Sequence, residues 1–564
     1  MKRLTLILAA LALTLSLSQC KKTETPTTDE GIFITLKAGY GNGAKTDFAP
    51  ATGAFVWTED AMEYIYVGGS NHSDCLGVLS GTGNGMVSMT FSGALTTTPD
   101  AGETLYFFYL GKGRDGSAVS TLNFSSQDGT LENVTNYHIA ISDGVEYAEQ
   151  TSFSTTLNMK MAIAYFDVDG FKNANEATET VYLHGEEVYS TAIIDYTNGT
   201  ITGETKGYIN LGTANNGKYV ALIPSVSTET TLSFDSNSKW GAMNFLRGIQ
   251  AGRYYSNGGA ALTVTAGALL EGTAPGLFSV SATKMVRFSK GNLQYIGSAE
   301  TPYWRFADNQ WDYLGDNGQN GNATNVDRDL FGWGTGNNPN LVSEEDVDYP
   351  SFNEWGANAI SNGGNTPAQW YTLSKDEWGY LSNSRSTTSG VFFAKAKVNN
   401  ERGVILLSDD WSSSNYTLNN TNEMYNAYFT SNIIDLTDWT NAFVANGAVF
   451  LPAAGYRMYG EVIAPGDGGH YWSSSPDNTN HAYTFNFSQG VSGSQHRCGG
   501  QSVRLVHNAG LIVDSDIVND VTAEGSIFSG WNNGGSDPWD DPTPGSGGST
   551  LGGWNNDGND PWGN

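Results

Sequence analysis

The stretch Ile32-Phe33-Ile34-Thr35-Leu36 carries the pattern that decides the fold. In an extended chain alternate side chains point to the same side, so Ile32, Ile34 and Leu36 form one apolar face. Comparable segments recur at 62–67 and 105–110, separated by Gly, Asn and Asp. Because these three residue types favour turns, the pattern predicts half-buried β-strands joined by loops.

A second group of strand-like segments follows, at 161–166, 180–183, 219–223 and 262–264. No long amphipathic helix pattern precedes residue 270. The chain has 564 residues, which predicts three or more domains at about 100 to 200 residues each. We therefore predict a mainly β protein that begins with two β-sandwiches, at residues 31–150 and 151–268.

The amino-terminal segment predicts export. Lys2 and Arg3 precede an apolar run at 4–17 that ends in Ser18-Gln19-Cys20. A helix over this run would span roughly 21 Å, against about 30 Å for a bilayer core, which favours a signal peptide at 1–20 over a membrane anchor. The cleavage region resembles a lipobox. That resemblance implies acylation of Cys20 with diacylglycerol and palmitate, outer-membrane lipid as a partner, and a surface-exposed location, with 21–30 as a tether.

Composition excludes some partners. The chain has 28 basic and 58 acidic side chains, a formal net charge of −30, so nucleic acid is not an expected partner. Beyond Cys20 the cysteines are Cys75 and Cys498, which fall in different predicted domains. A disulfide framework is therefore not expected.

The two predicted sandwiches resemble a known family. The segments at 45–48, 52–57 and 64–67, and later 251–255 leading into 262–264, are similar to Bacteroidales fimbrillin-like proteins. The segment 105–109 departs from the family pattern because no proline follows its tyrosine. The resemblance implies a lipid-anchored pilus subunit, or a relative with the same fold, and pilus subunits as partners.

Residues 275–508 resemble a different family. After a boundary at 267–276, a series of motifs is similar to the Fibrobacter major paralogous domain (FISUMP), which shares the C-type-lectin-like fold. These motifs lie at 278–281, 286–295, 304–306, 329–334, 370–378, 404–407, 450–457, 471–475 and 500–506. The resemblance implies an α+β domain that displays a variable binding surface. Within it, Ser374 and Glu377 predict a capping box that starts a helix, with Trp378 and Leu381 facing the core.

The last segment, 509–564, predicts a disordered tail. It repeats a Gly, Asn, Asp and Trp-rich decapeptide at 530–539 and 553–562 and has few aliphatic residues. The four tryptophans of the repeats could dock in a partner groove or stack on sugars, but a passive extension is the favoured interpretation.

The segment 468–499 is the strongest candidate for ligand binding, because it mixes aromatic, amide and imidazole groups that make adaptable recognition surfaces. Trp472, Phe485 and Phe487 are expected in the core instead. The predicted ligand-binding residues are His470, Asp477, Asn478, Asn480, His481, Tyr483, Gln495, His496, Arg497 and Cys498.

Metal and catalytic sites are not predicted. The spacing of His470, His481, His496 and Cys498 matches no compact zinc pattern. The acidic and amide side chains that could hold calcium fail the EF-hand template, which favours a solvated loop; they are Asp308, Asp312, Asp316, Asn320, Asp327 and Asp329. A formylglycine-generating activity would need a cysteine pair, and no pair of carboxylates stands out for glycoside hydrolysis.

The leading hypothesis is a non-enzymatic, lipid-anchored adhesin or pilus tip or accessory subunit of the outer membrane, without a cofactor, whose residues 275–508 bind a surface protein or glycan. The alternatives are a fimbrial stalk subunit that assembles by strand exchange, and a surface glycan-binding lipoprotein.

Overall fold

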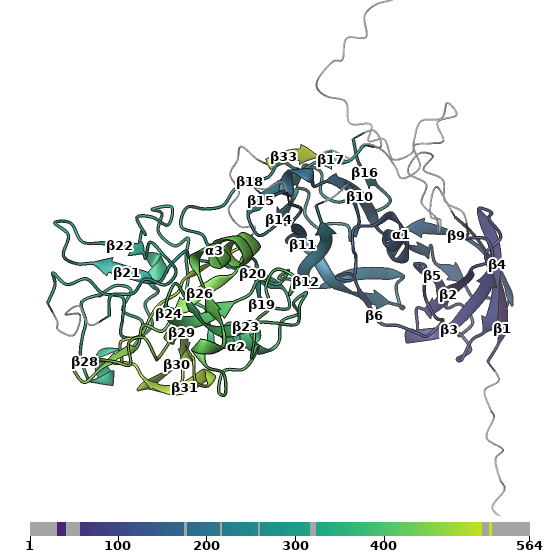
Figure 1. The fold of residues 1–564 in the computed structure, drawn as a ribbon. Helices are drawn as coiled ribbons and strands as arrows, with labels where there is room; N and C mark the ends of the chain where they lie inside the picture. Colours follow the sequence, from purple (N-terminus) through teal and green to yellow (C-terminus); the bar gives the residue numbers. More distant parts are fainter. Residues whose placement is uncertain are drawn as a thin grey trace, which may run out of the picture.

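The computed structural model describes residues 31–40, 57–173, 177–214, 217–257, 260–315, 323–509 and 518–521. Within them the chain forms three β-rich units in a row (Figure 1), and the predicted mainly β architecture is confirmed. The predicted signal peptide, Cys20, the tether and both tail decapeptides lie outside the described residues. Among the described residues, no helix combines the length and apolar composition needed to cross a bilayer.

The first unit is one sheet that closes on itself, because β2 pairs with β5 as well as with β3. β1 pairs antiparallel with β4 and parallel with β9. The short helices α1 (Leu131–Val134) and η1 (Thr135–Tyr137) precede β7. The strands are β1 (Phe33–Tyr40), β2 (Met62–Gly69), β3 (His72–Thr82), β4 (Ser88–Ala94), β5 (Thr104–Leu110), β7 (Ile139–Ser142), β8 (Val145–Glu146) and β9 (Ser152–Met159).

The second unit is a sandwich of two sheets around one core. One sheet contains β10 (Ala162–Asp167), β13 (Gly217–Leu222), β16 (Tyr254–Tyr255) and β17 (Leu262–Thr263), with η2 (Asp169–Phe171) after β10. The other contains β6 (Thr121–Asn123), β11 (Thr180–Asp195), β12 (Thr200–Thr213), β14 (Thr230–Asp235), β15 (Lys239–Phe245), β18 (Gly267–Ala268) and β33 (Val518–Val521).

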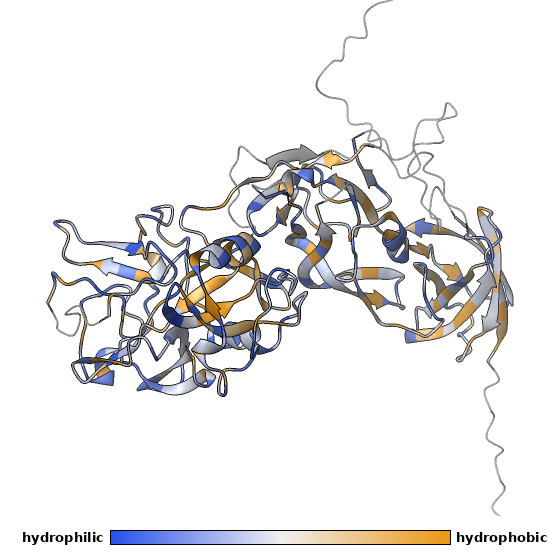
Figure 2. Cartoon of the chain, viewed as in Figure 1, coloured by the Kyte–Doolittle hydropathy of each residue, from blue (hydrophilic) through white to orange (hydrophobic). Residues whose placement is uncertain are grey.

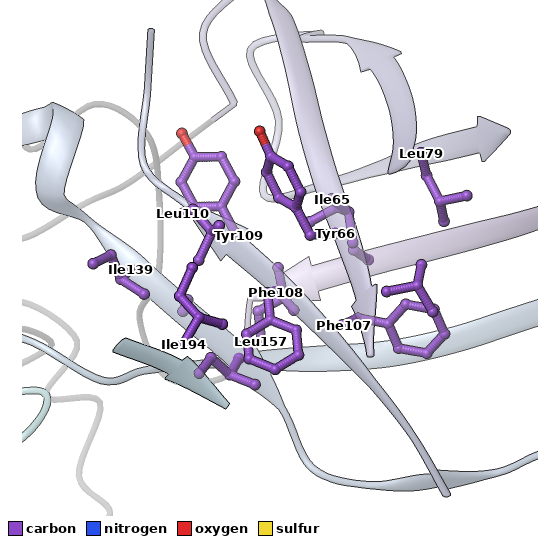
Figure 3. Close-up of a cluster of buried hydrophobic side chains, with 14 of the residues drawn as sticks. Ile65, Tyr66, Leu79, Phe107, Phe108, Tyr109, Leu110, Ile139, Leu157 and Ile194 are labelled. Carbon is purple, nitrogen blue, oxygen red and sulfur yellow. The ribbon is translucent and has the colours of Figure 1, made fainter. Parts of the chain in front are cut away.

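The first two units share side chains and a strand. Figure 3 shows Ile194 of β11 beside Phe108 and Leu157 in the first unit's core. Conversely, β6 lies between β5 and β7 of the first unit in the sequence, but it pairs with β11 in a sheet of the second unit. The first sheet also extends to Met159, past the expected boundary at residue 150. The two units are therefore interlocked rather than joined by a simple linker.

The third unit combines several small sheets with short helices. Strongly apolar strands lie at its centre in Figure 2. Its strands are β19 (Phe278–Ser281), β20 (Lys284–Phe288), β21 (Leu293–Ile296), β22 (Tyr303–Phe306), β23 (Phe393–Val398), β24 (Glu401–Leu406), β25 (Ile433–Ile434), β26 (Val449–Pro452), β27 (Tyr456–Met458), β28 (Glu461–Ile463), β29 (His470–Pro476), β30 (His481–Asn486), β31 (Gly490–His496) and β32 (Val506–Asn508). Its helices are η3 (Asp346–Asp348), η4 (Trp355–Ala357), α2 (Lys375–Asn383), η5 (Phe429–Ser431), α3 (Leu436–Asp438), η6 (Trp439–Phe443) and η7 (Val444–Asn446).

Helix α2 forms as the sequence predicts. Ser374 accepts a hydrogen bond from the Glu377 amide, and the Glu377 carboxylate accepts one from the Ser374 amide. This capping box satisfies amides that the first helical turn leaves without partners. Trp378 and Leu381 are buried, as expected.

One part of the predicted tail is ordered. Val518–Val521 form β33, which pairs parallel with Ala242–Phe245 of β15. The expectation of disorder over all of 509–564 is thus corrected at these four residues, because the edge of β15 supplies backbone hydrogen-bonding groups that an extended segment can pair.

Candidate functional site

The segment predicted to bind ligand forms a three-stranded antiparallel sheet, β29-β30-β31, at the lower edge of the third unit in Figure 1. Phe485 of β30 stacks on Trp378 of α2, with ring centroids 4.8 Å apart and planes 3° apart. Trp472 and Phe487 are also buried, so the expectation that these three side chains belong to the core is confirmed.

Helix α2 covers only part of this sheet. On β30, His481, Tyr483 and Phe485 alternate and therefore share one face. Phe485 lies under α2, whereas Lys375 at the start of the helix places its Nζ 4.7 Å from the centre of the Tyr483 ring. Tyr483 and His481 thus continue this face beyond the helix, where both are half-buried.

A bulge in β31 shapes the same face. The register shifts between Ala482 and Thr484, where β31 has one extra residue. Ser494 there has a positive φ of 61°, a conformation that few residues other than glycine adopt. The Ser494 amide donates a 3.0 Å hydrogen bond to Asp477 Oδ2, which fixes the carboxylate beside the bulge.

Two histidines sit opposite each other at the end of this face. His481 and His496 are direct cross-strand partners, and their ring centroids are 4.6 Å apart. His496 Nδ1 lies 2.7 Å from Asp346 Oδ2 of η3. The exposed or half-exposed side chains of Lys375, Asp477, His481, Tyr483 and His496 are called the β30 face below.

Other predicted ligand-binding residues lie in the β29–β30 turn or on the opposite side of the sheet. Asn478 Oδ1 accepts hydrogen bonds from the amides of Asn480 and His481, which closes the β29–β30 turn. Asn480 is exposed in that turn. Gln495 is the cross-strand partner of the buried Ala482 and so points to the opposite side of the sheet from His481.

Arg497 is buried inside the structure. Its guanidinium donates to the carbonyl oxygens of His481, Asn478, Tyr349 and Pro350, at 3.3, 2.5, 3.1 and 3.2 Å. It also lies 4.3 Å from the centre of the Trp333 ring, a cation–π contact. The side chain thereby holds the 349–350 segment against the β29–β30 turn.

His470 is largely buried as well. Its ring lies 4.8 Å from that of Tyr456, and its Nδ1 has no hydrogen-bond partner among the residues that the structure describes. Burial lowers the pKa of His470 to about 4, so the ring is neutral near neutral pH.

Cys498 lies two residues after the end of β31 and is 5% exposed. Its amide donates to Asp346 Oδ1 at 3.1 Å. Burial, with the Asp346 carboxylate next to it, raises the pKa of the Cys498 thiol to about 12. A thiol with such a pKa stays protonated and is a poor nucleophile, which gives no support to thiol-based catalysis.

Sequence reasoning missed Asp346 and Lys375. Asp346 lies in an acidic run at 344–348, and the run alone does not show that it faces a histidine 150 residues further along the chain. The sequence also did not predict the exposure of Tyr425, Tyr428 and Tyr459, which lie outside the β30 face and are 79%, 74% and 74% exposed. Single exposed aromatic residues leave no periodic pattern that a sequence would reveal.

The acidic residues considered for calcium have separate local contacts. Asp308 pairs with Arg305 at 2.5 Å, and Asp312 Oδ2 accepts a hydrogen bond from the Asn309 amide. Asp327 and Asp329 accept hydrogen bonds from the amides of Ser298 and Leu314. Asp316 and Asn320 lie outside the described residues.

Residues 427–506 match the model of a protein family described as a domain of unknown function, DUF8237. This segment contains the whole β29-β30-β31 sheet. No curated protein matches the chain.

Three solved structures illustrate the structural matches. A Bacteroides uniformis protein assigned to cell adhesion is 13% identical, with a TM-score of 0.26 over 43% of this chain and 93% of its own. A fimbrial assembly protein from Parabacteroides distasonis is 12% identical, with a TM-score of 0.24 over 46% of this chain and 96% of its own. The tip fimbrial protein of Porphyromonas gingivalis, truncated at its C-terminus, is 9% identical, with a TM-score of 0.24 over 40% of this chain and 93% of its own.

Proposed function

We propose that this protein is a non-enzymatic adhesin at the cell surface, anchored by lipid on Cys20, and that its third unit binds an external glycan or protein through the β30 face. Anchoring rests on the lipobox-like Ser18-Gln19-Cys20 and the apolar run before it. When cells are grown with labelled palmitate, the parent protein should incorporate the label and the Cys20→Ser variant should not. Unchanged labelling of the variant would refute lipid anchoring at Cys20.

The observation that carries the binding proposal is the continuity of the β30 face. The Lys375 ammonium lies over the Tyr483 ring, and the bulge places Asp477 beside that ring. A cation from the first residue of α2, an aromatic ring of β30 and a carboxylate therefore lie side by side at the start of the helix. Aromatic rings supply apolar contact area to a sugar or peptide, and the flanking charges supply directional hydrogen bonds.

A glycan array probed with the labelled full chain tests this role. Tyr483→Ala should weaken binding at least about tenfold, since an aromatic contact at the centre of an interface contributes on the order of 2 kcal/mol. Tyr425→Ala is the matched control, because Tyr425 is 79% exposed but belongs to another part of the unit. Equal binding by the Tyr483 variant and the parent chain would refute the proposed face.

A second candidate function is favoured by β33. A parallel strand from the C-terminal part of the chain adds to β15, which shows that this sheet edge accepts an extra strand. The same edge could accept a strand from another subunit, and the protein would then be a stalk subunit that assembles by strand exchange. Filaments of purified protein in electron micrographs would support this function, and persistent monomers would count against it.

A further inference from the structure

Three side chains of types that bind metals meet at the end of the β30 face, to which one of them, His496, also belongs. They are Asp346, His496 and Cys498, called the Asp346 cluster below. Their carboxylate oxygen, ring nitrogen and sulfur all lie within 4.8 Å of one another. Asp346 belongs to η3, whereas His496 ends β31 and Cys498 follows it closely, so the cluster is assembled by the fold from two distant segments.

The separations suit a small ion. With metal–nitrogen and metal–sulfur bonds of about 2.0 and 2.3 Å, ligand atoms of a tetrahedral zinc site lie about 3.5 Å apart. The His496 Nδ1 to Asp346 Oδ2 distance is 2.7 Å, below that value, and the 4.8 Å limit of the cluster lies above it. Adjustments of about 1 Å in side-chain position would therefore bring all three groups to bonding distance around one ion.

The three side chains of the cluster differ in exposure. The His496 side chain is 50% exposed and that of Asp346 is 11% exposed, whereas Cys498 is 5% exposed. An ion would enter past His496 and come to rest with Cys498 at the floor of the site. Three protein ligands then leave a fourth position toward the solvent, as in zinc sites that exchange their outer ligand.

We propose that Asp346, His496 and Cys498 bind a divalent transition-metal ion of the zinc type, with water or an external group in the fourth position. Thiolate and imidazole ligands favour such ions, whereas calcium and magnesium prefer sets of oxygen ligands. On binding, sulfur loses its proton to solvent and bonds the metal instead.

Cobalt absorption provides the first test. The full chain carrying Cys20→Ser and Cys75→Ser keeps Cys498 as its one thiol. Addition of Co²⁺ should produce a thiolate-to-metal charge-transfer band in the near ultraviolet, and Cys498→Ser in the same background should abolish it. Absence of the band, or its persistence without Cys498, would overturn the proposal.

Zinc affinity provides a second test, which holds even if the Cys498 variant fails to fold. Asp346→Asn should weaken Zn²⁺ binding at least about tenfold in competition with a chromophoric chelator. Asp348→Asn is the matched control, because Asp348 is an exposed acid two residues away. Equal effects of the two substitutions would show a general electrostatic attraction and would overturn the site.

Discussion

At the scale of single residues, Arg497 shows how the fold can reverse the role that a side chain suggests. A polar residue in a Gly- and Ser-rich segment is expected to be exposed and available to a ligand. The structure instead buries the guanidinium over Trp333 and surrounds it with carbonyl oxygens. Because arginine presents several donors in a rigid planar group, it can join two loops at once.

Arg497→Ala should therefore lower the stability of the folded protein more than it lowers the affinity for a ligand. We expect a loss of about 2 to 4 kcal/mol in the free energy of unfolding, because buried carbonyl groups lose their charged donor. Urea denaturation followed by tryptophan fluorescence measures this change. A loss below about 1 kcal/mol would show that solvent replaces the guanidinium at no great cost.

At the scale of elements, α2 begins where local chemistry dictates. Removing the cap with Ser374→Ala should cost about 1 kcal/mol in unfolding free energy, because the Glu377 amide loses its acceptor. Ser413→Ala, at an exposed serine outside any helix, should change stability by less than about 0.5 kcal/mol. Chemical denaturation of both variants tests the cap, and equal effects would argue against it.

The β33 strand is the second feature at this scale. Deletion of residues 510–564 should expose the backbone of Ala242–Phe245 and speed its amide hydrogen exchange, because the parallel partner is lost. Deletion of 522–564 alone keeps β33 and should leave that exchange unchanged. If both deletions behave alike, β33 does not protect β15 in solution.

At the scale of the whole molecule, a buried ion pair and hydrogen bonds join the second and third units. Arg287 of β20 donates to Asp235 Oδ1 at 2.8 Å, and His184 Nε2 lies 2.5 Å from Asp235 Oδ2. Asn237 donates to both carboxylate oxygens of Asp410 at 2.7 Å. The second and third units are therefore joined by side-chain contacts as well as by the chain that connects them.

This junction predicts an acid-dependent loss of stability. Burial alone would raise the pKa of Asp235, but His184 and Arg287 outweigh burial and hold the pKa below its ordinary value of 3.8. The stabilising contribution is thus complete above pH 3.8 and is lost as the pH falls toward the lower pKa of the folded state.

Asp235→Asn should remove this acid dependence and cost about 3 to 5 kcal/mol near neutral pH, since it leaves Arg287 buried without its counter-charge. Free energies of unfolding measured across the acidic range for both proteins test the assignment. Parallel pH profiles for the two proteins would contradict it.

The sequence alone determined the features that depend on neighbouring residues. The alternation around Ile34 and Leu36 predicts a strand with both side chains buried, and the Ser374 and Glu377 pair predicts the start of α2; both are confirmed. Such signals are readable because strand alternation and helix capping involve groups only two to four positions apart.

Only the tertiary structure decided which distant groups meet. Asp346 faces His496 and Cys498, Arg497 turns inward, and β33 returns to β15. Each of these contacts joins segments far apart in the chain, and they form because packing of the cores brings those segments together. No local periodicity encodes them, so the sequence could not divide the segment predicted to bind ligand into structural and exposed residues.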